Sequence, residues 1–319
     1  MMKNRIQNAG FHPQGVGRVV PVAKATTATL GIRGRAPSMG FTLVEMIMVI
    51  VITGILGGMV AMFLKAPVQQ YMDVGRRADM TDVANTASRR VVRDVRLALP
   101  NSVNVYGACT GSTSCTLQFI PTSAGGRYRA YQNAANSLPP SQVFSVSAVP
   151  PTTQLLVLAP PPAVPAIGTG DQVVIYNQNV QDAYNGLNRT SGSNTAGTTT
   201  ADGTLLNLGT GIQFPYASPN QRFNIVNMPV SYVCNPNQTT PALGTLTRVT
   251  GSSWTYQSAV GTGNLLAKNV SSCNFTYSPS VVAQRAGLVT LGLGISEADL
   301  SGNMESVTLY SAAHVSNEP

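Results

Sequence analysis

The feature that most constrains this chain is a run of 24 predominantly apolar residues at positions 41–64, which contains a single acid, Glu45. As an α-helix the run would rise about 36 Å, enough to cross a hydrocarbon core of about 30 Å. A secretory signal peptide has a shorter apolar region of about 7–15 residues followed by a small-x-small cleavage site, and neither condition is met. We therefore expect one membrane-spanning helix.

Glu45 is the unusual residue of this span. A carboxylate inside a membrane costs several kcal/mol unless another group compensates its charge. Three cations lie on each side of the span within about 20 residues, so the charge bias leaves its orientation open. The cysteines and the polar bulk downstream favour a C-terminal part outside the cytoplasm.

The formal net charge of +8 is unevenly distributed along the chain. Residues 1–40 hold six cations and no acid, whereas from Ala98 onward seven basic residues face seven acidic ones. The bulk of the protein is therefore neutral, and we expect no nucleic-acid partner.

Residues 40–45 read Gly-Phe-Thr-Leu-Val-Glu and precede the apolar helix. This string resembles the N-terminus of type IV prepilins and pseudopilins. In that family a membrane-embedded prepilin peptidase cuts after the glycine and methylates the new terminal phenylalanine. The resemblance implies that residues 1–40 are a cleaved leader, that cleavage follows Gly40, and that Phe41 becomes the N-methylated mature terminus.

The same resemblance gives Glu45 a role in assembly. In a packed filament, its carboxylate meets the charged amine of Phe41 from a neighbouring subunit, which offsets the cost of burying either charge. The pairing would fix the axial register of the subunits. The alternative is an interfacial acid that the membrane merely tolerates.

The helix is expected to continue beyond the span. Between residues 68 and 97, apolar side chains recur mostly at steps of three and four, which predicts an amphipathic helix with one face on a folded head. The pair Leu99-Pro100 ends it, because the residue before proline disfavours helix. The expected domains are a helix at 41–99, divided into a span (41–64) and an amphipathic stem (65–99), and a head at 100–319.

The head has a β pattern. Short runs of strand-forming residues are separated by Gly, Pro, Asn and Ser, at 142–149, 154–159, 171–176, 223–226, 230–234 and 288–295. The low-complexity segment 191–203 is predicted to be a mobile loop. The fold class expected is α+β and pilin-like, with a long N-terminal helix packed on an antiparallel β-sheet head.

The C-terminal third carries a second resemblance, on the strings VSYVC (230–234), LTR (246–248), SSCNFTY (271–277), GLVTLGLGI and the ending HVSNEP. They are similar to the heads of minor pilins of the mannose-sensitive haemagglutinin (MSHA) system, of the MshO type. The region 101–225 shows no resemblance that we can name.

Four cysteines, Cys109, Cys115, Cys234 and Cys273, form no CxxC pair, and the chain has only two histidines, so we expect no zinc site. In an exported domain two disulfides are the natural interpretation, most simply Cys109–Cys115 and Cys234–Cys273. Four cysteines allow three connectivities, and four buried thiols are the alternative.

No motif of a hydrolase, nucleotide-binding protein or metalloprotease is present, so we expect neither an enzyme nor a cofactor. The acidic segment 296–306 is predicted to be a hairpin turn rather than a metal site. His314 is predicted to be structural. Four arginines in the stem are predicted to form a solvated face rather than an anion or DNA site: Arg89, Arg90, Arg93 and Arg96.

These features lead to the hypothesis of a minor pilin or pseudopilin of a type IV (MSHA-like) pilus, acting in initiation or at the tip. The alternatives are a type II secretion pseudopilin and a DNA-uptake or adhesion minor pilin. The expected partners are prepilin peptidase, other pilin or pseudopilin subunits, the inner-membrane assembly platform and the lipid bilayer. The expected location is the bacterial inner membrane, with the head in the periplasm, and then the extracellular filament.

Overall fold

The computed structural model describes residues 40–108, 113–130, 144, 146, 151–158, 167, 170–191, 195–200, 203–251, 253–282 and 285–319. The chain divides into two units, with the boundary between Val60 and Ala61. Helix α1 (Leu43–Val95) begins in the first unit and ends in the second. It is long and apolar enough to cross a membrane.

The start of α1 is fixed by a cap. The hydroxyl oxygen of Thr42 accepts a hydrogen bond from the backbone N–H of Glu45 at 3.2 Å, which satisfies one of the donors that a helix N-terminus leaves free. The helix remains continuous through Pro67.

The stem packs on the head through a narrow stripe. Its buried apolar residues follow steps of four, three, four and four: Met80, Ala84, Ala87, Val91 and Val95. The apolar stripe predicted to start at Val68 is wrong in its first part, because Val68 and Met72 are exposed. The amphipathic contact therefore starts at Met80 and occupies only the last turns of α1.

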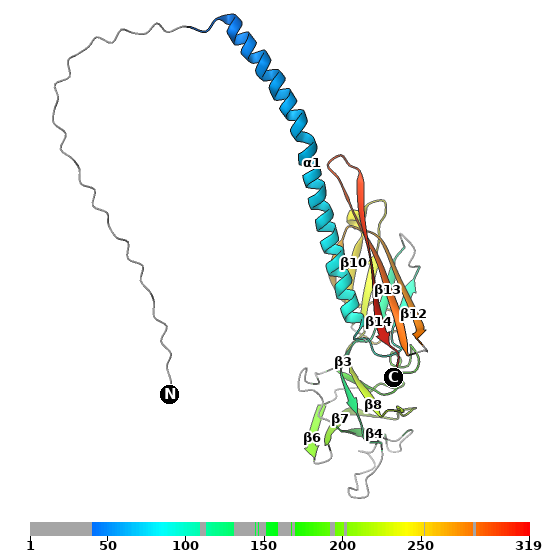
Figure 1. Ribbon diagram of the computed structural model, residues 1–319. Coiled ribbons are helices and arrows are strands. Elements are labelled where there is room, and N and C mark those ends of the chain that lie inside the picture. Colours follow the sequence, from blue (N-terminus) through cyan, green and yellow to red (C-terminus); the bar gives the residue numbers. More distant parts are fainter. Residues whose placement is uncertain are drawn as a thin grey trace, which may run out of the picture. The chain divides into compact units, whose positions relative to one another are not determined.

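Two antiparallel sheets receive this stripe. A five-stranded sheet has the order β1-β2-β9-β10-β11, and a three-stranded sheet has the order β12-β13-β14. Figure 1 shows α1 running beside the strands β10, β13 and β14. The strands are β1 (Asn104–Gly107), β2 (Cys115–Phe119), β9 (Val230–Asn235), β10 (Thr245–Gly251), β11 (Gly261–Lys268), β12 (Val270–Val282), β13 (Ala286–Ala298) and β14 (Met304–Ser316).

One hydrophobic core joins the helix to both sheets. Val91 and Val95 of the stem belong to the same buried cluster as Tyr232 of β9 and Leu291 of β13. Inward and outward residues alternate along β13, as expected for a strand with one face on a core. The α+β class with a long helix packed on antiparallel sheets, expected from the sequence, is confirmed.

The middle of the chain builds a second core. Two further three-stranded sheets have the orders β3-β8-β5 and β4-β7-β6. Their strands are β3 (Thr122–Arg127), β4 (Thr152–Val157), β5 (Gln172–Val174), β6 (Thr195–Thr200), β7 (Gly203–Ile212) and β8 (Arg222–Val226). Tyr128, Phe214 and Phe223 are fully or almost fully buried among them.

The prediction of a loop at 191–203 is wrong in part, because β6 occupies 195–200 and pairs with β7. Threonine is branched at Cβ and favours extended backbone, so a threonine-rich segment beside β7 forms an edge strand. The run predicted at 142–149 lies largely outside the described residues.

Candidate functional site

The start of α1 is the region that the sequence singles out. Phe41 is exposed, with 77 % of its surface accessible, and Glu45 lies in the first helical turn. The apolar side chains from Leu43 to Leu64 are exposed as well. A helix that is apolar on all sides and uncovered needs lipid or another protein around it.

Gly40 has no packing reason to be glycine among the described residues. A Cβ added there would meet nothing within 4 Å, and its backbone is not in the left-handed region. Glycine is therefore not demanded by the fold at this position.

The Glu45 carboxylate forms no ion pair within the part of the chain that the structure describes. Its backbone N–H is bound by Thr42, and its position near the helix N-terminus is favourable for a negative charge. Thr42 was missed in the sequence reasoning. The signal was present, because Thr-x-x-Glu before an apolar run is the pattern of a capping box.

The glycines of the span leave open space beside the helix. A Cβ at Gly54, Gly57 or Gly58 would meet nothing within 4 Å. Gly54 and Gly58 are four residues apart and lie on one side of the helix, the spacing that lets two membrane helices approach closely. The isolated chain does not use this freedom.

Ion pairs fasten the stem to β14. Arg76 Nη2 lies 2.8 Å from Glu305 Oε2 and 2.8 Å from Asp73 Oδ1, and Arg77 Nε donates to Glu305 Oε1 at 2.8 Å. The hydrogen bonds from Arg77 and Arg76 lower the pKa of Glu305 below its ordinary value. A charged cluster therefore links the stem to the head before the buried apolar stripe begins at Met80.

A second polar link lies near the end of the stem. Asp94 Oδ2 accepts hydrogen bonds from Tyr232 Oη at 2.8 Å and from Arg248 Nε at 2.8 Å. Burial alone would raise the pKa of Asp94, but the hydrogen bonds from Tyr232 and Arg248 outweigh it, so the pKa lies below its ordinary value. This network joins α1 to β9 and β10.

The arginines of the stem divide between this network and solvent. Arg90 and Arg93 lie 3.2 Å and 3.7 Å from Asp94 Oδ1, while Arg89 and Arg96 are exposed.

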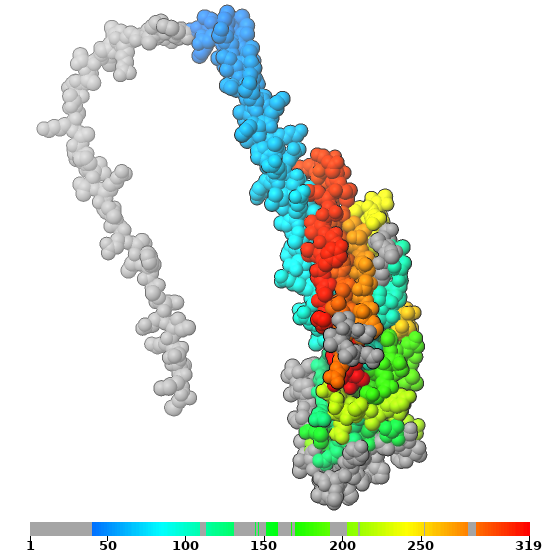
Figure 2. All heavy atoms as spheres, turned by 45° about the vertical axis from the view of Figure 1, so that its right-hand side comes forward, coloured from blue at the N-terminus to red at the C-terminus, as the bar shows by residue number. Residues whose placement is uncertain are grey.

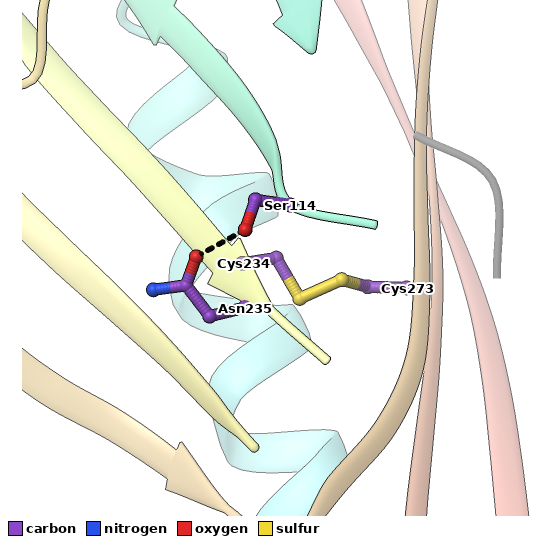
Figure 3. Close-up of a disulfide and its surroundings, with 4 residues drawn as sticks. All are labelled: Ser114, Cys234, Asn235 and Cys273. Carbon is purple, nitrogen blue, oxygen red and sulfur yellow. Dashed lines mark hydrogen bonds between the residues drawn. A yellow bond between two sulfur atoms is a disulfide. The ribbon is translucent and has the colours of Figure 1, made fainter. Parts of the chain in front are cut away.

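A disulfide ties the two sheets together. Cys234 of β9 is bonded to Cys273 of β12 (Figure 3), so this predicted pairing is confirmed. Beside it, Ser114 Oγ donates to Asn235 Oδ1 at 2.7 Å. Cys115 is disulfide-bonded too, and its predicted partner, Cys109, lies outside the described residues. Such bonds are typical of oxidising compartments outside the cytoplasm.

The segment 296–306 forms the turn between β13 and β14, as predicted. Asp299 Oδ1 accepts hydrogen bonds from the backbone N–H groups of Ser301 at 2.8 Å and Asn303 at 2.7 Å. Among the described residues no group of three His, Cys, Asp or Glu side chains could hold a metal ion. His314 is exposed on β14, opposite Leu288.

We compared the chain with protein-family models, with curated proteins and with solved structures, and none of the three comparisons gave a match.

Proposed function

We propose that this chain is a structural subunit, a minor pilin or pseudopilin, that prepilin peptidase cleaves after Gly40 and that then packs into a type IV-like filament. The start or the tip of the filament is the place expected for such a subunit. The partners in this proposal are other pilin-type subunits and the inner-membrane platform that extrudes them.

The observation that carries the proposal is the carboxylate of Glu45, which forms no ion pair among the described residues and lies in the first turn of an uncovered apolar helix. A free amine at Phe41 of a neighbouring subunit would supply the missing opposite charge. Two charges that meet away from water attract strongly enough to offset much of their desolvation only when the geometry is close. Such a contact therefore stabilises one axial register between neighbouring subunits.

Three further observations support the proposal. A Cβ at Gly40 would meet no described residue within 4 Å, the span glycines leave room for close helix packing, and the Cys234–Cys273 disulfide suits a head outside the cytoplasm. A neutral, disulfide-bonded β head without a metal cluster among its described residues is suited to contacts rather than chemistry.

Processing is tested with Gly40→Leu in the full chain carrying a C-terminal tag. We expect the precursor to accumulate with residues 1–40 attached, because a bulky side chain blocks the peptidase. Gly75→Leu is the matched control, since Gly75 also has open space around it. Intact mass of the membrane fraction is the readout, and mature-sized protein from Gly40→Leu would refute the processing step.

Assembly is tested with Glu45→Ala. The variant should insert and be cleaved, but its recovery in sheared filaments should fall at least about tenfold, which corresponds to a loss of 1.4 kcal/mol or more in subunit contacts. Met46→Ala is the control, because Met46 is an exposed neighbour without charge. Recovery of Glu45→Ala at the wild-type level would contradict the pairing.

A further inference from the structure

Exposed apolar side chains do not end with the span. Beyond Lys65, the stem exposes Tyr71 (80 % accessible) and Val74 (65 %), whereas Met80 is only 2 % accessible. Two turns of the stem therefore carry apolar surface that the head leaves uncovered. Contiguous exposed apolar surface of this kind marks a contact with a membrane or a protein.

The hairpin between β13 and β14 brings a second apolar group to the same place. Leu300, in its turn, is 70 % accessible. A groove of about 580 Å³ is lined by Tyr71, Met72 and Val74 from the stem and by Ala298 and Leu300 from the hairpin. Figure 2 shows the hairpin, in red, lying against the stem. We call Tyr71, Val74 and Leu300 the tip patch.

The tip patch lies close to where the bilayer ends. Lys65 is the first charged residue after Glu45, so the hydrocarbon boundary falls near it. Tyr71 follows six residues later, about 9 Å along the helix, and the headgroup region on each side of a bilayer is about 5–7 Å thick. Helical side chains lean toward the N-terminus, which here is the membrane side, so the Tyr71 ring reaches back toward the headgroups.

The charges around the tip patch decide which kind of lipid surface it fits. Glu305 is already paired with Arg76 and Arg77, and the Asp299 carboxylate accepts hydrogen bonds within its own turn. Glu297 remains exposed. The patch has no surplus of cations, so an anionic lipid surface offers it no attraction, and burial of apolar groups is the available driving force.

We propose that, in the unassembled chain, the tip patch rests in the headgroup region of the bilayer that the span crosses. The partner is a zwitterionic lipid surface, with the Tyr71 ring at headgroup level and the Leu300 side chain inserted beside it. The hairpin is then a second membrane contact that limits how the head and its stem tilt relative to the bilayer. This inference depends on the span alone and not on filament formation.

The test places a tryptophan at the hairpin. In a Trp254→Phe background, which keeps an aromatic ring where the Arg189 guanidinium stacks at 3.9 Å, Leu300→Trp reports on the tip patch. Tyr310→Trp is the matched control, because Tyr310 is 84 % accessible on β14 of the same sheet. The full chain is reconstituted at high dilution in phosphatidylcholine vesicles, with and without lipids brominated near the glycerol end of the acyl chains.

We expect Leu300→Trp to emit at shorter wavelength than Tyr310→Trp and to be quenched severalfold more by the brominated lipid. Met304→Trp, at the start of β14, should show the same trend and replaces Leu300→Trp if that variant misfolds. Equal quenching of the hairpin and control tryptophans would overturn the proposal. Quenching that requires added phosphatidylglycerol would overturn the zwitterionic assignment, and quenching that disappears on dilution of the protein would assign the patch to a second copy instead. If the contact is seen but Glu45→Ala is recovered in sheared filaments at the wild-type level, the inference stays intact and the proposed pairing of Glu45 is rejected.

Discussion

Replacing Asp94 by alanine is the perturbation that most directly tests how the stem is fixed to the head. The Asp94 side chain is 12 % accessible, and its carboxylate binds Arg248, whose side chain is 21 % accessible. Tyr232, which donates the other hydrogen bond, is fully buried. The substitution removes the acceptor and leaves both donors at the interface of α1 with β9 and β10.

The cost follows from those contacts. Hydrogen bonds to a charged group contribute about 1.5–3 kcal/mol each, and breaking a buried pair from one side costs about 3–5 kcal/mol. Arg248 is partly accessible, so water can replace part of the hydrogen bonding that it loses, and the cost should lie at the lower end of these values. We expect a loss of about 2–4 kcal/mol in the free energy of unfolding, which for a domain of this size lowers Tm by roughly 4–10 °C.

The assay is urea unfolding and thermal melting of the unit that starts at Ala61. Asp82→Ala is the matched control on the same helix, because Asp82 is exposed and should change stability by less than about 0.5 kcal/mol. Asp94→Asn should fall between the two, since its amide oxygen still accepts from Tyr232. If Asp94→Ala is no less stable than Asp82→Ala, the polar network does not hold the stem and the reasoning from its geometry is wrong.

Three further predictions concern the head and its contact with the stem. Cys234→Ser removes the disulfide that closes a loop with a sequence separation of 39 residues, and it should lower the free energy of unfolding by about 4 kcal/mol. The variant should therefore have a lower Tm, and reductant should not lower that Tm further by breaking this bond. Gly244→Ala should destabilise the head by about 1–3 kcal/mol, because the new Cβ would lie 1.9 Å from the Val270 carbonyl oxygen. Gly75→Ala is the control: a Cβ there meets nothing within 4 Å, so it should leave the Tm unchanged or raise it. The pKa of Asp94 in the folded state lies below its unfolded value of about 4. The stability that the ionised Asp94 contributes should therefore be fully present above about pH 4 and be lost as the pH falls through the folded pKa. In a pH series of unfolding midpoints, Asp94→Ala should lose less stability than the wild type at acid pH.

The elements of this fold follow from periodicity where one face is buried and one is not. Five predicted runs overlap observed strands, because alternation and β-branched residues encode strand pairing locally: 154–159, 171–176, 223–226, 230–234 and 288–295. The long helix is equally evident. Its contact with the head is not, because Val68 and Met72 have the spacing of a packed stripe and only the position of the head decides whether they are covered.

The polar links between stem and head could not be predicted from local sequence either. Asp94 and Arg248 are 154 residues apart, and nothing in either local sequence pairs them. The strand β11 was not predicted, because Gly261-Thr-Gly has little strand propensity and gains its backbone hydrogen bonds from β10. Thr42 is a different case, since its capping pattern with Glu45 is local and can be predicted from the sequence.

Under the proposed function, the cap and the cleavage site act on the same few atoms. A peptide bond at Phe41 is neutral, whereas cleavage leaves a cation next to the positive end of the helix dipole, where a positive charge is unfavourable. Thr42 already satisfies the Glu45 N–H, so the helix start survives the loss of the leader. The new amine is then a destabilising charge on its own chain that is relieved by a carboxylate from another. Acetylation of that amine after cleavage would keep the span and the cap but remove the cation, and assembly should fail as it does in Glu45→Ala; filaments built from acetylated subunits would show that cleavage acts through size rather than charge.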